Sequence, residues 1–200
     1  MSGLATRVVA GIAVGFGAGP AAVLLTLVLG AGVALVLGAG PAGSAFAEET
    51  TGTIPDLSAR DLDGKKVDLR DAITAPTVII FWATWCKPCR KEMPELERLV
   101  ERYREQGLSV VAINGDGPVD QAKIRPYVKA LGFTFTVIPD PDGEIRRRFQ
   151  VEVFPTSFLV DGEGRIVHRQ VGYRRGDEKI LEARIRELLS VEAAGEEMGG

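Results

Sequence analysis

The chain has few of the residues that bind metals or cross-link small folds. Its 200 residues include two cysteines and one histidine. Two cysteines exclude a framework of several disulfides. Two thiols and one imidazole fall one ligand short of a tetrahedral zinc site, and the spacing of the carboxylates does not suggest a fourth ligand. A chain of this length can bury a core without either kind of support.

Charge is also missing from the first part of the chain. Residues 8–47 contain no Asp, Glu, Lys, Arg or His, and Arg7 is the only charged residue before them. All 27 acidic residues and 23 of the 24 basic residues follow, so the remainder carries a net charge of 23 − 27 = −4. A mildly acidic body without a basic cluster argues against nucleic acid as a partner.

The uncharged stretch indicates a targeting or membrane segment. Residues 21–39 are an apolar run that, as a helix, nearly spans a hydrocarbon core. Ala45-Phe46-Ala47 then has the small-x-small form of a signal peptidase site. We expect export, with residues 1–47 either cleaved after Ala47 or kept as a membrane anchor; a buried helix of a cytosolic fold is the third alternative. With Arg7 on the cytoplasmic side, the remaining chain is extracytoplasmic or periplasmic.

The body of the chain predicts an α/β domain over residues 48–190 and a flexible tail over residues 191–200. A hairpin turning at Asp63-Gly64 comes first. Apolar runs predict buried strands, and apolar positions three or four residues apart predict helices. In chain order we expect a strand at 77–83, a helix at 89–106, a strand at 108–115, a helix at 120–131, a strand at 133–139, a helical turn at 144–151, a hairpin at 155–172 and a helix at 177–190. This order gives a central mixed β-sheet with helices on both faces.

The two cysteines lie in the segment FWATWCKPC, residues 81–89. As a structural disulfide they would contribute little, because closing so short a loop stabilises the fold by only about 2 kcal/mol. As a redox pair they have a mechanism. Cys86 falls where a strand ends and a helix begins, so the helix dipole favours its thiolate, and Lys87 adds a cation. Pro88 suits the first helical turn. Cys86 would attack a substrate disulfide, and the more shielded Cys89 would resolve the mixed disulfide.

These residues resemble the active-site segment of the thioredoxin-like family, in particular its exported TlpA/ResA-type thiol-disulfide oxidoreductases. The resemblance covers most of residues 53–190. Trp85 matches the tryptophan before the first cysteine, and Pro94 matches a proline that kinks the following helix. Pro155 matches a cis-proline opposite the dithiol, although an ordinary trans proline opening a strand is the simpler interpretation of the residue alone.

The resemblance implies a substrate-binding surface around the two sulfurs. The backbone edge before the cis-proline pairs with the substrate chain in this family, and Phe154 occupies that position here. The residues expected to contact substrate are Trp85, Lys87, Pro88, Phe154 and Pro155.

One position departs from the cytosolic thioredoxins. Those proteins carry a buried acid six residues before the first cysteine, where this chain has Ile80. The exported branch instead uses a glutamate three residues after the second cysteine, which matches Glu92. Residues three apart share a helix face, so Glu92 is a candidate proton relay for Cys89. The alternative is a surface glutamate favoured by the helix dipole.

The resemblance predicts a reductase of disulfides in other exported proteins, with apocytochrome c or copper-site cysteines of an oxidase as substrates. It needs no cofactor beyond the redox-active disulfide, and a membrane thiol donor would return it to the reduced state.

A disulfide oxidase or isomerase with the same residues stays open. So does a copper-delivery protein using both cysteines and His168, although His168 fits an exposed strand position better than a ligand. A peroxidase of the peroxiredoxin type is disfavoured by the C-x-x-C motif. The run at residues 146–148 (Arg-Arg-Arg) fits a solvated helix face, with a docking surface for an acidic partner as the alternative.

Overall fold

The computed structural model describes residues 52–73 and 75–198, with side chains described as far as Val191. The predicted export segment, residues 1–47, lies outside this part, so that prediction stays untested. Among the helices in the described part, none combines the length and the apolar character needed to cross a bilayer.

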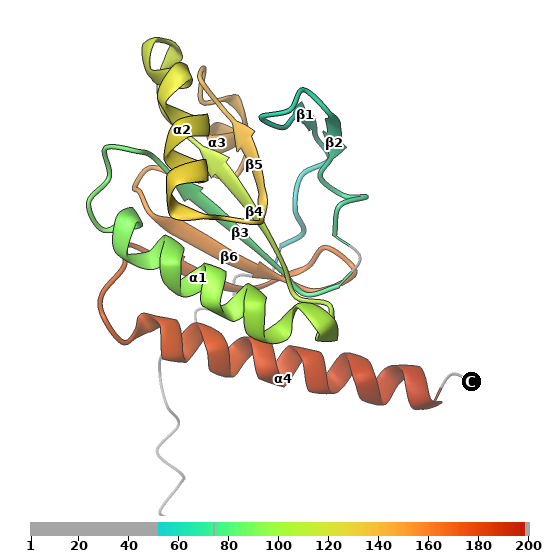
Figure 1. Cartoon of the computed structure of the whole chain (residues 1–200). Helices are drawn as coiled ribbons and strands as arrows, with labels where there is room; N and C mark the ends of the chain where they lie inside the picture. The colour runs from blue at the N-terminus through green and yellow to red at the C-terminus, as the bar shows by residue number, and fades with distance from the viewer. Residues whose placement is uncertain (1–51, 74, 199–200) are drawn as a thin grey trace, which may run out of the picture. The chain divides into compact units, whose positions relative to one another are not determined.

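A five-stranded mixed sheet forms the centre of the domain, as predicted (Figure 1). Its strand order is β5-β4-β3-β6-β7. The first three in chain order, β3 (Thr77–Trp82), β4 (Ser109–Asn114) and β5 (Thr136–Pro139), are parallel. The last two, β6 (Thr156–Val160) and β7 (Ile166–Val171), form the antiparallel hairpin. Every residue of β3 is buried, because the strand is central and covered on both faces.

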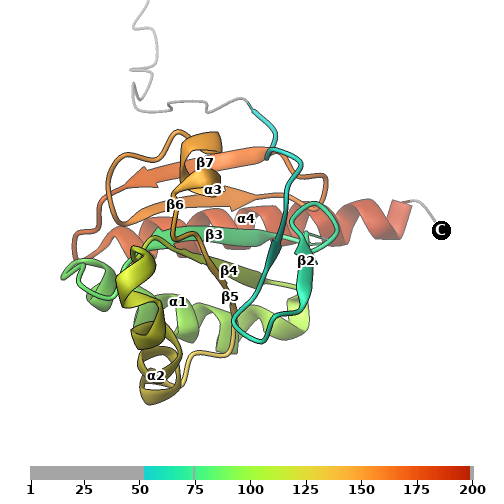
Figure 2. The same ribbon diagram turned by 90° about the horizontal axis from the view of Figure 1, so that it is seen from above.

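Helices cover both faces of the sheet, as predicted. One layer of the core joins alternate β3 residues, such as Ile80, to helices α1 (Cys89–Tyr103), α2 (Gln121–Leu131) and α4 (Asp177–Met198). The other layer joins the intervening β3 residues to the short helix α3 (Glu144–Arg148). The small hairpin of β1 (Ser58–Arg60) and β2 (Lys66–Asp68) forms a separate two-stranded sheet (Figure 2). Two 3₁₀ turns, Arg104–Gln106 and Pro118–Asp120, complete the elements.

Glycines end the helices where the sequence predicts, and several element boundaries differ. Gly107 and Gly132 adopt left-handed φ angles of 98° and 69° at the two C-caps. Strand β5 begins at Thr136 rather than at residue 133. Helix α4 runs to Met198, so the tail predicted at 191–200 is helical over its first eight residues. The Glu and Ala residues of that stretch have high helix propensity, which outweighs its single internal glycine.

The strand directions bring three separate segments to one edge of the sheet. Strands β3 and β4 are parallel, so the residues that follow Trp82 and Asn114 emerge at the same edge. Strand β6 is antiparallel to β3, with Thr156 opposite Phe81, so β6 begins at this edge. The cysteine loop, the loop after β4 and the segment before β6 therefore meet there.

Candidate active site

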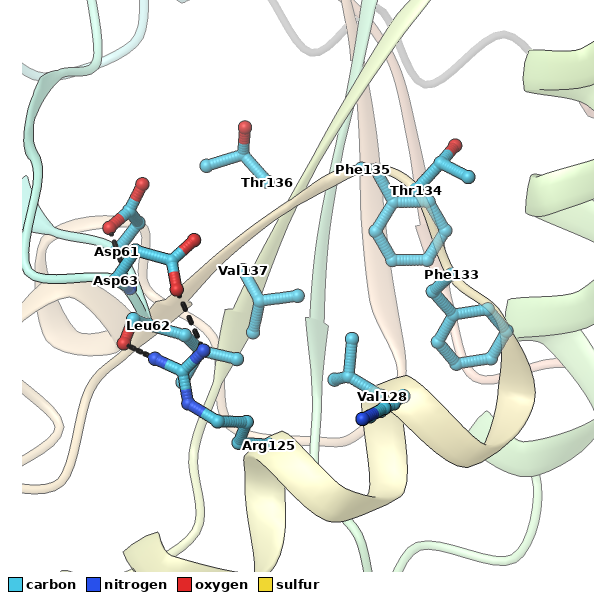
Figure 3. A pocket seen from close by; sticks show the side chains of 11 residues that line it. Asp61, Leu62, Asp63, Arg125, Val128, Phe133, Thr134, Phe135, Thr136 and Val137 are labelled. Atoms are coloured by element: carbon cyan, nitrogen blue, oxygen red, sulfur yellow. Dashed lines mark hydrogen bonds and ion pairs between the residues drawn. The ribbon is translucent and has the colours of Figure 1, made fainter.

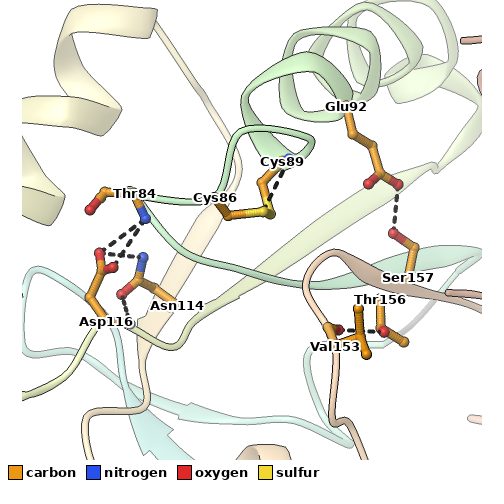
Figure 4. Close-up of a disulfide and its surroundings, with 9 residues drawn as sticks. All are labelled: Thr84, Cys86, Cys89, Glu92, Asn114, Asp116, Val153, Thr156 and Ser157. Atoms are coloured by element: carbon orange, nitrogen blue, oxygen red, sulfur yellow. Dashed lines mark hydrogen bonds between the residues drawn. A yellow bond between two sulfur atoms is a disulfide. The ribbon is translucent and has the colours of Figure 1, made fainter. Parts of the chain in front are cut away.

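Cys86 and Cys89 form a disulfide at the N-terminal end of α1, with their Cα atoms 5.3 Å apart (Figure 4). Cys86 lies in the loop after β3, and Cys89 is the first residue of the helix. The Cys89 backbone N–H donates to the Cys86 Sγ at 3.2 Å. A free N–H of the first helical turn thus points at this sulfur, which is the arrangement that favours a thiolate at Cys86 in the reduced protein.

The two sulfurs differ in access to solvent. Cys86 is 4% exposed and Cys89 is fully buried, so a substrate sulfur reaches Cys86 first. Trp85 is 62% exposed and Lys87 is also exposed, whereas Pro88 is half-buried at the helix N-cap. Cys89 is therefore the more shielded of the two cysteines, as predicted, and the order of attack stays a prediction.

The segment before β6 lies against the cysteine loop. The Phe154–Pro155 peptide bond is cis, as the resemblance implied. The rings of Trp85 and Phe154 lie 5.9 Å apart, and the Arg146 guanidinium lies 5.7 Å from the Phe154 ring centre. Gly115 makes this position possible, because a Cβ there would come within 2.3 Å of the Phe154 ring. Direct contact of these residues with substrate remains a prediction.

Glu92 is buried one turn into α1, on the same helix face as Cys89. Its side chain is 2% exposed, so the alternative of a surface glutamate is wrong. Ser157 Oγ donates to Glu92 Oε1 at 2.8 Å, and Gln170 Nε2 lies 3.5 Å from the same oxygen. Oε2 has no hydrogen-bond partner among the described residues. Burial raises the pKa of Glu92 to about 7; the negative charge of Asp177 also raises it, and the Ser157 hydrogen bond opposes the rise.

The partners of Glu92 come from a row of residues across three strands. Ile80 on β3 pairs with Ser157 on β6, and Ser157 pairs with Gln170 on β7. The position that holds an acid in cytosolic thioredoxins is therefore apolar here, and the next two strands supply hydrogen bonds to Glu92. Sequence reasoning missed Ser157 and Gln170, although a serine in an otherwise apolar strand was a usable signal.

Comparison with known proteins places this site in a family. The family model described as "AhpC/TSA family" matches residues 51–169. The chain belongs to the AhpC/TSA family. It is 38% identical to the thiol-disulfide oxidoreductase ResA of Bacillus thuringiensis subsp. konkukian over 118 residues, which cover 59% of this chain and 67% of the relative. It is 30% identical to ResA of Bacillus subtilis over 147 residues, covering 72% and 76% of the two chains.

Solved structures agree with this assignment. A crystal structure from Chlorobium tepidum, named as a thiol:disulfide interchange protein DsbE, is 32% identical with a TM-score of 0.65, and the match covers 70% of this chain and 96% of that one. A thioredoxin-like protein from Porphyromonas gingivalis is 30% identical with a TM-score of 0.61, covering 68% and 92%. The fold is thioredoxin-like, and with its Cys86–Cys89 pair this AhpC/TSA family member is a thiol-disulfide oxidoreductase.

A second buried carboxylate, Asp116, holds the loop that leads to the cysteines of this family member. Its Oδ1 and Oδ2 accept the Thr84 backbone N–H at 3.1 and 3.2 Å, and Oδ2 accepts Asn114 Nδ2 at 3.1 Å (Figure 4). The Asp116 N–H in turn donates to Asn114 Oδ1 at 3.0 Å. Sequence reasoning missed this cluster. Its signal was a polar Asn-Gly-Asp run directly after a buried strand.

His168 is separate from the dithiol. Among the described residues, no group of three or more His, Cys, Asp or Glu side chains is gathered in a way that could hold a metal ion, so Cys86, Cys89 and His168 do not form the set that a copper site requires. His168 lies on the edge strand β7, where it is half-buried rather than exposed. Burial lowers its pKa, and the positive charge of Arg184 lowers it further.

Proposed function

We propose that this protein is an extracytoplasmic reductase that transfers two electrons from the Cys86–Cys89 dithiol to disulfides of other exported proteins. The observation that supports the proposal is the buried pair itself: a nearly enclosed disulfide at a helix N-terminus, with the buried carboxyl of Glu92 one turn behind it.

The first step uses Cys86. In the reduced protein the Cys86 thiolate attacks one sulfur of the substrate disulfide, and the other substrate sulfur leaves as a thiolate. The Cys89 N–H and the helix dipole stabilise the attacking thiolate. The backbone of the cis-proline segment pairs with the substrate chain, next to the neighbouring rings of Trp85 and Phe154.

The second step uses Cys89 and Glu92. Cys89 loses its proton and attacks the Cys86 sulfur of the mixed disulfide, which forms the Cys86–Cys89 bond and releases the second substrate thiolate. The Glu92 carboxylate accepts that proton. A carboxyl with a pKa of about 7 exists in both protonation states near neutral pH, so it can take up and return a proton in each cycle.

The rest of the chain supports a proposal for the location, and the location supports one for the electron source. The uncharged segment at residues 8–47 supports export, as a cleaved signal or as a membrane anchor. A reductase outside the cytoplasm needs a donor, because that environment is oxidising, and we propose a membrane thiol protein. The substrates we propose are cysteine pairs awaiting a metal or haem, as in apocytochrome c.

The reduction potential of the Cys86–Cys89 pair tests this proposal, measured by equilibration of the full chain with glutathione or dithiothreitol buffers. We expect a value near that of thioredoxin, about −270 mV. A value near that of the strong oxidant DsbA, about −120 mV, would assign the protein to disulfide formation instead. The Cys86→Ser and Cys89→Ser variants supply the control, since neither can form the pair.

A further inference from the structure

A charged groove opens beside the dithiol helix. It has a volume of about 610 Å³ and runs between α1 and the segment that joins β7 to α4. Figure 1 shows the beginning of α4 next to the N-terminal end of α1, where Cys89 lies. The charged side chains that line the groove are Lys91, Arg98, Arg174, Arg175, Glu95 and Glu178.

The groove is positive although the protein is acidic. Its four cations and two carboxylates give a net charge of 4 − 2 = +2, against −3 for the whole chain. Both carboxylates are already engaged. Glu95 pairs with Arg98, and Glu178 accepts the Tyr173 hydroxyl at 2.8 Å and the Gly176 N–H at 2.8 Å.

Three of the cations are free to bind. The side chains of Lys91, Arg174 and Arg175 are exposed and have no ion-pair or hydrogen-bond partner within residues 52–73 and 75–198. The nearby Asp177 carboxylate does not neutralise them by direct pairing, because it accepts the Arg174 backbone N–H at 2.7 Å. Lys87 and Arg90, next to the two cysteines in the sequence, are exposed as well.

Several other cations of the domain are held by internal contacts. In the groove of Figure 3, Arg125 donates to Asp63 at 2.7 Å and to the Leu62 carbonyl. In the run at residues 146–148, Arg147 and Arg148 donate to backbone carbonyls at 2.7 Å, and Arg146 stacks on Phe154. Exposed cations also lie elsewhere, for example Lys65 and Lys66 on the β1–β2 hairpin. This groove differs in gathering three cations that have no partner among the described residues, whereas the arginine run that the sequence offered as a docking surface is held by internal contacts.

We infer that this groove docks an acidic segment of the protein whose disulfide is reduced. Carboxylates of the substrate would pair with Lys91, Arg174 and Arg175 while its disulfide lies at Cys86. The inference rests on the proposed function and names a substrate class for it. Such pairing speeds encounter and selects among partners, and salt weakens it.

The test measures single-turnover reduction by the full chain, reduced beforehand with dithiothreitol and freed of it. The substrates are three peptides with the same disulfide and acidic, neutral or basic flanks, plus uncharged hydroxyethyl disulfide. We expect the acidic peptide to react about tenfold faster than the neutral one at low salt and the basic peptide to be slowest, with the differences shrinking in high salt. The double variant R174E/R175E should lose the preference for acidic flanks and reduce hydroxyethyl disulfide at the unaltered rate.

The matched control is K65E/K66E, on the exposed β1–β2 hairpin. It changes the net charge by the same amount as R174E/R175E and should keep the preference for acidic flanks. Equal rates for the three peptides, or the same loss of preference in both double variants, would overturn the inference. Binding of the wild type to phosphatidylglycerol vesicles without any peptide preference would assign the cations to a lipid surface and would also overturn it. Failure of the wild type to reduce hydroxyethyl disulfide would instead contradict the proposed function.

Discussion

Two buried carboxylates, Asp116 and Glu92, lie on either side of the Cys86–Cys89 disulfide, and they are bonded in different ways (Figure 4). Both Asp116 oxygens accept hydrogen bonds, from the Thr84 N–H and from the Asn114 amide. Glu92 has one bonded oxygen and one without a partner among the described residues. The Asp116 carboxylate ties the loop at Thr84 to the end of β4, whereas a carboxyl buried with few donors, such as Glu92, holds a proton more easily. The first fits a structural role and the second a role in proton transfer.

The largest effect is expected for Asp116→Ala. The substitution leaves the Thr84 N–H and the Asn114 amide without their acceptor, and each such loss costs about 1–3 kcal/mol, so we expect about 4 kcal/mol less stability. Urea unfolding of the oxidised protein measures it. Asp116→Asn keeps one acceptor oxygen and should cost less. Equal stability of Asp116→Ala and wild type would show that this cluster does not support the loop.

Glu92→Gln should change the pH dependence of stability. Folding raises the Glu92 pKa from 4.5 to about 7, so the folded chain binds more protons than the unfolded chain between these pH values. The stability that this group contributes is fully present below pH 4.5 and is lost as pH rises through 7, by on the order of 3 kcal/mol. We expect Gln to remove this decline, so that the variant is relatively more stable at pH 8. Urea titrations at pH 5 and pH 8 test this, and parallel changes in both proteins would contradict it.

Glu92→Gln should also slow the resolving step. Loss of a positioned base typically lowers the rate of the step it assists by a factor of about 100. Here we expect release of the second substrate thiol to be slower, while release of the first is unchanged. Rapid-mixing measurements of the two thiols separate these steps. Glu101→Gln, an exposed position further along the same helix and outside the groove, is the matched control and should leave both rates unchanged. A Glu92→Gln variant with an unchanged second step would remove Glu92 from the mechanism.

The smallest effect is expected for Ser157→Ala. Among the described residues, the Ser157 hydroxyl is the one group that donates to Glu92 at short distance, and its hydrogen bond lowers the Glu92 pKa. Its removal should therefore raise that pKa above the wild-type value and move the pH dependence of the resolving step to higher pH. If the pH midpoint of the resolving step falls or does not move, Ser157 does not control the pKa of the Glu92 carboxyl.

The sequence predicts the parts of this site that depend on local spacing. Cys86, Cys89 and Glu92 fall at a strand-to-helix junction and on one helix face, and each of these positions follows from residues close in the chain. Asp116 and Ser157 depend instead on which strands flank β3, and on one being parallel and the other antiparallel. A single sequence does not state this order, so the bonds to Thr84 and Glu92 were not predicted.

The end of α4 and the positive groove were missed for related reasons. The sequence predicts a flexible tail from residue 191, yet α4 continues to Met198, because the residues there have high helix propensity. The groove forms only when α1 packs beside the loop before α4, which brings Lys91 next to Arg174 and Arg175.

The central claim, that Glu92 is a buried carboxyl exchanging a proton near neutral pH, is tested most directly by titrating it. Carbon-13 NMR of the glutamate side-chain carboxyls of the full oxidised chain gives each midpoint, and the resonance missing from Glu92→Gln assigns Glu92. The account predicts a midpoint of about 7. A midpoint at the ordinary value of 4.5 would show a permanently ionised carboxylate and would contradict the proposed proton relay.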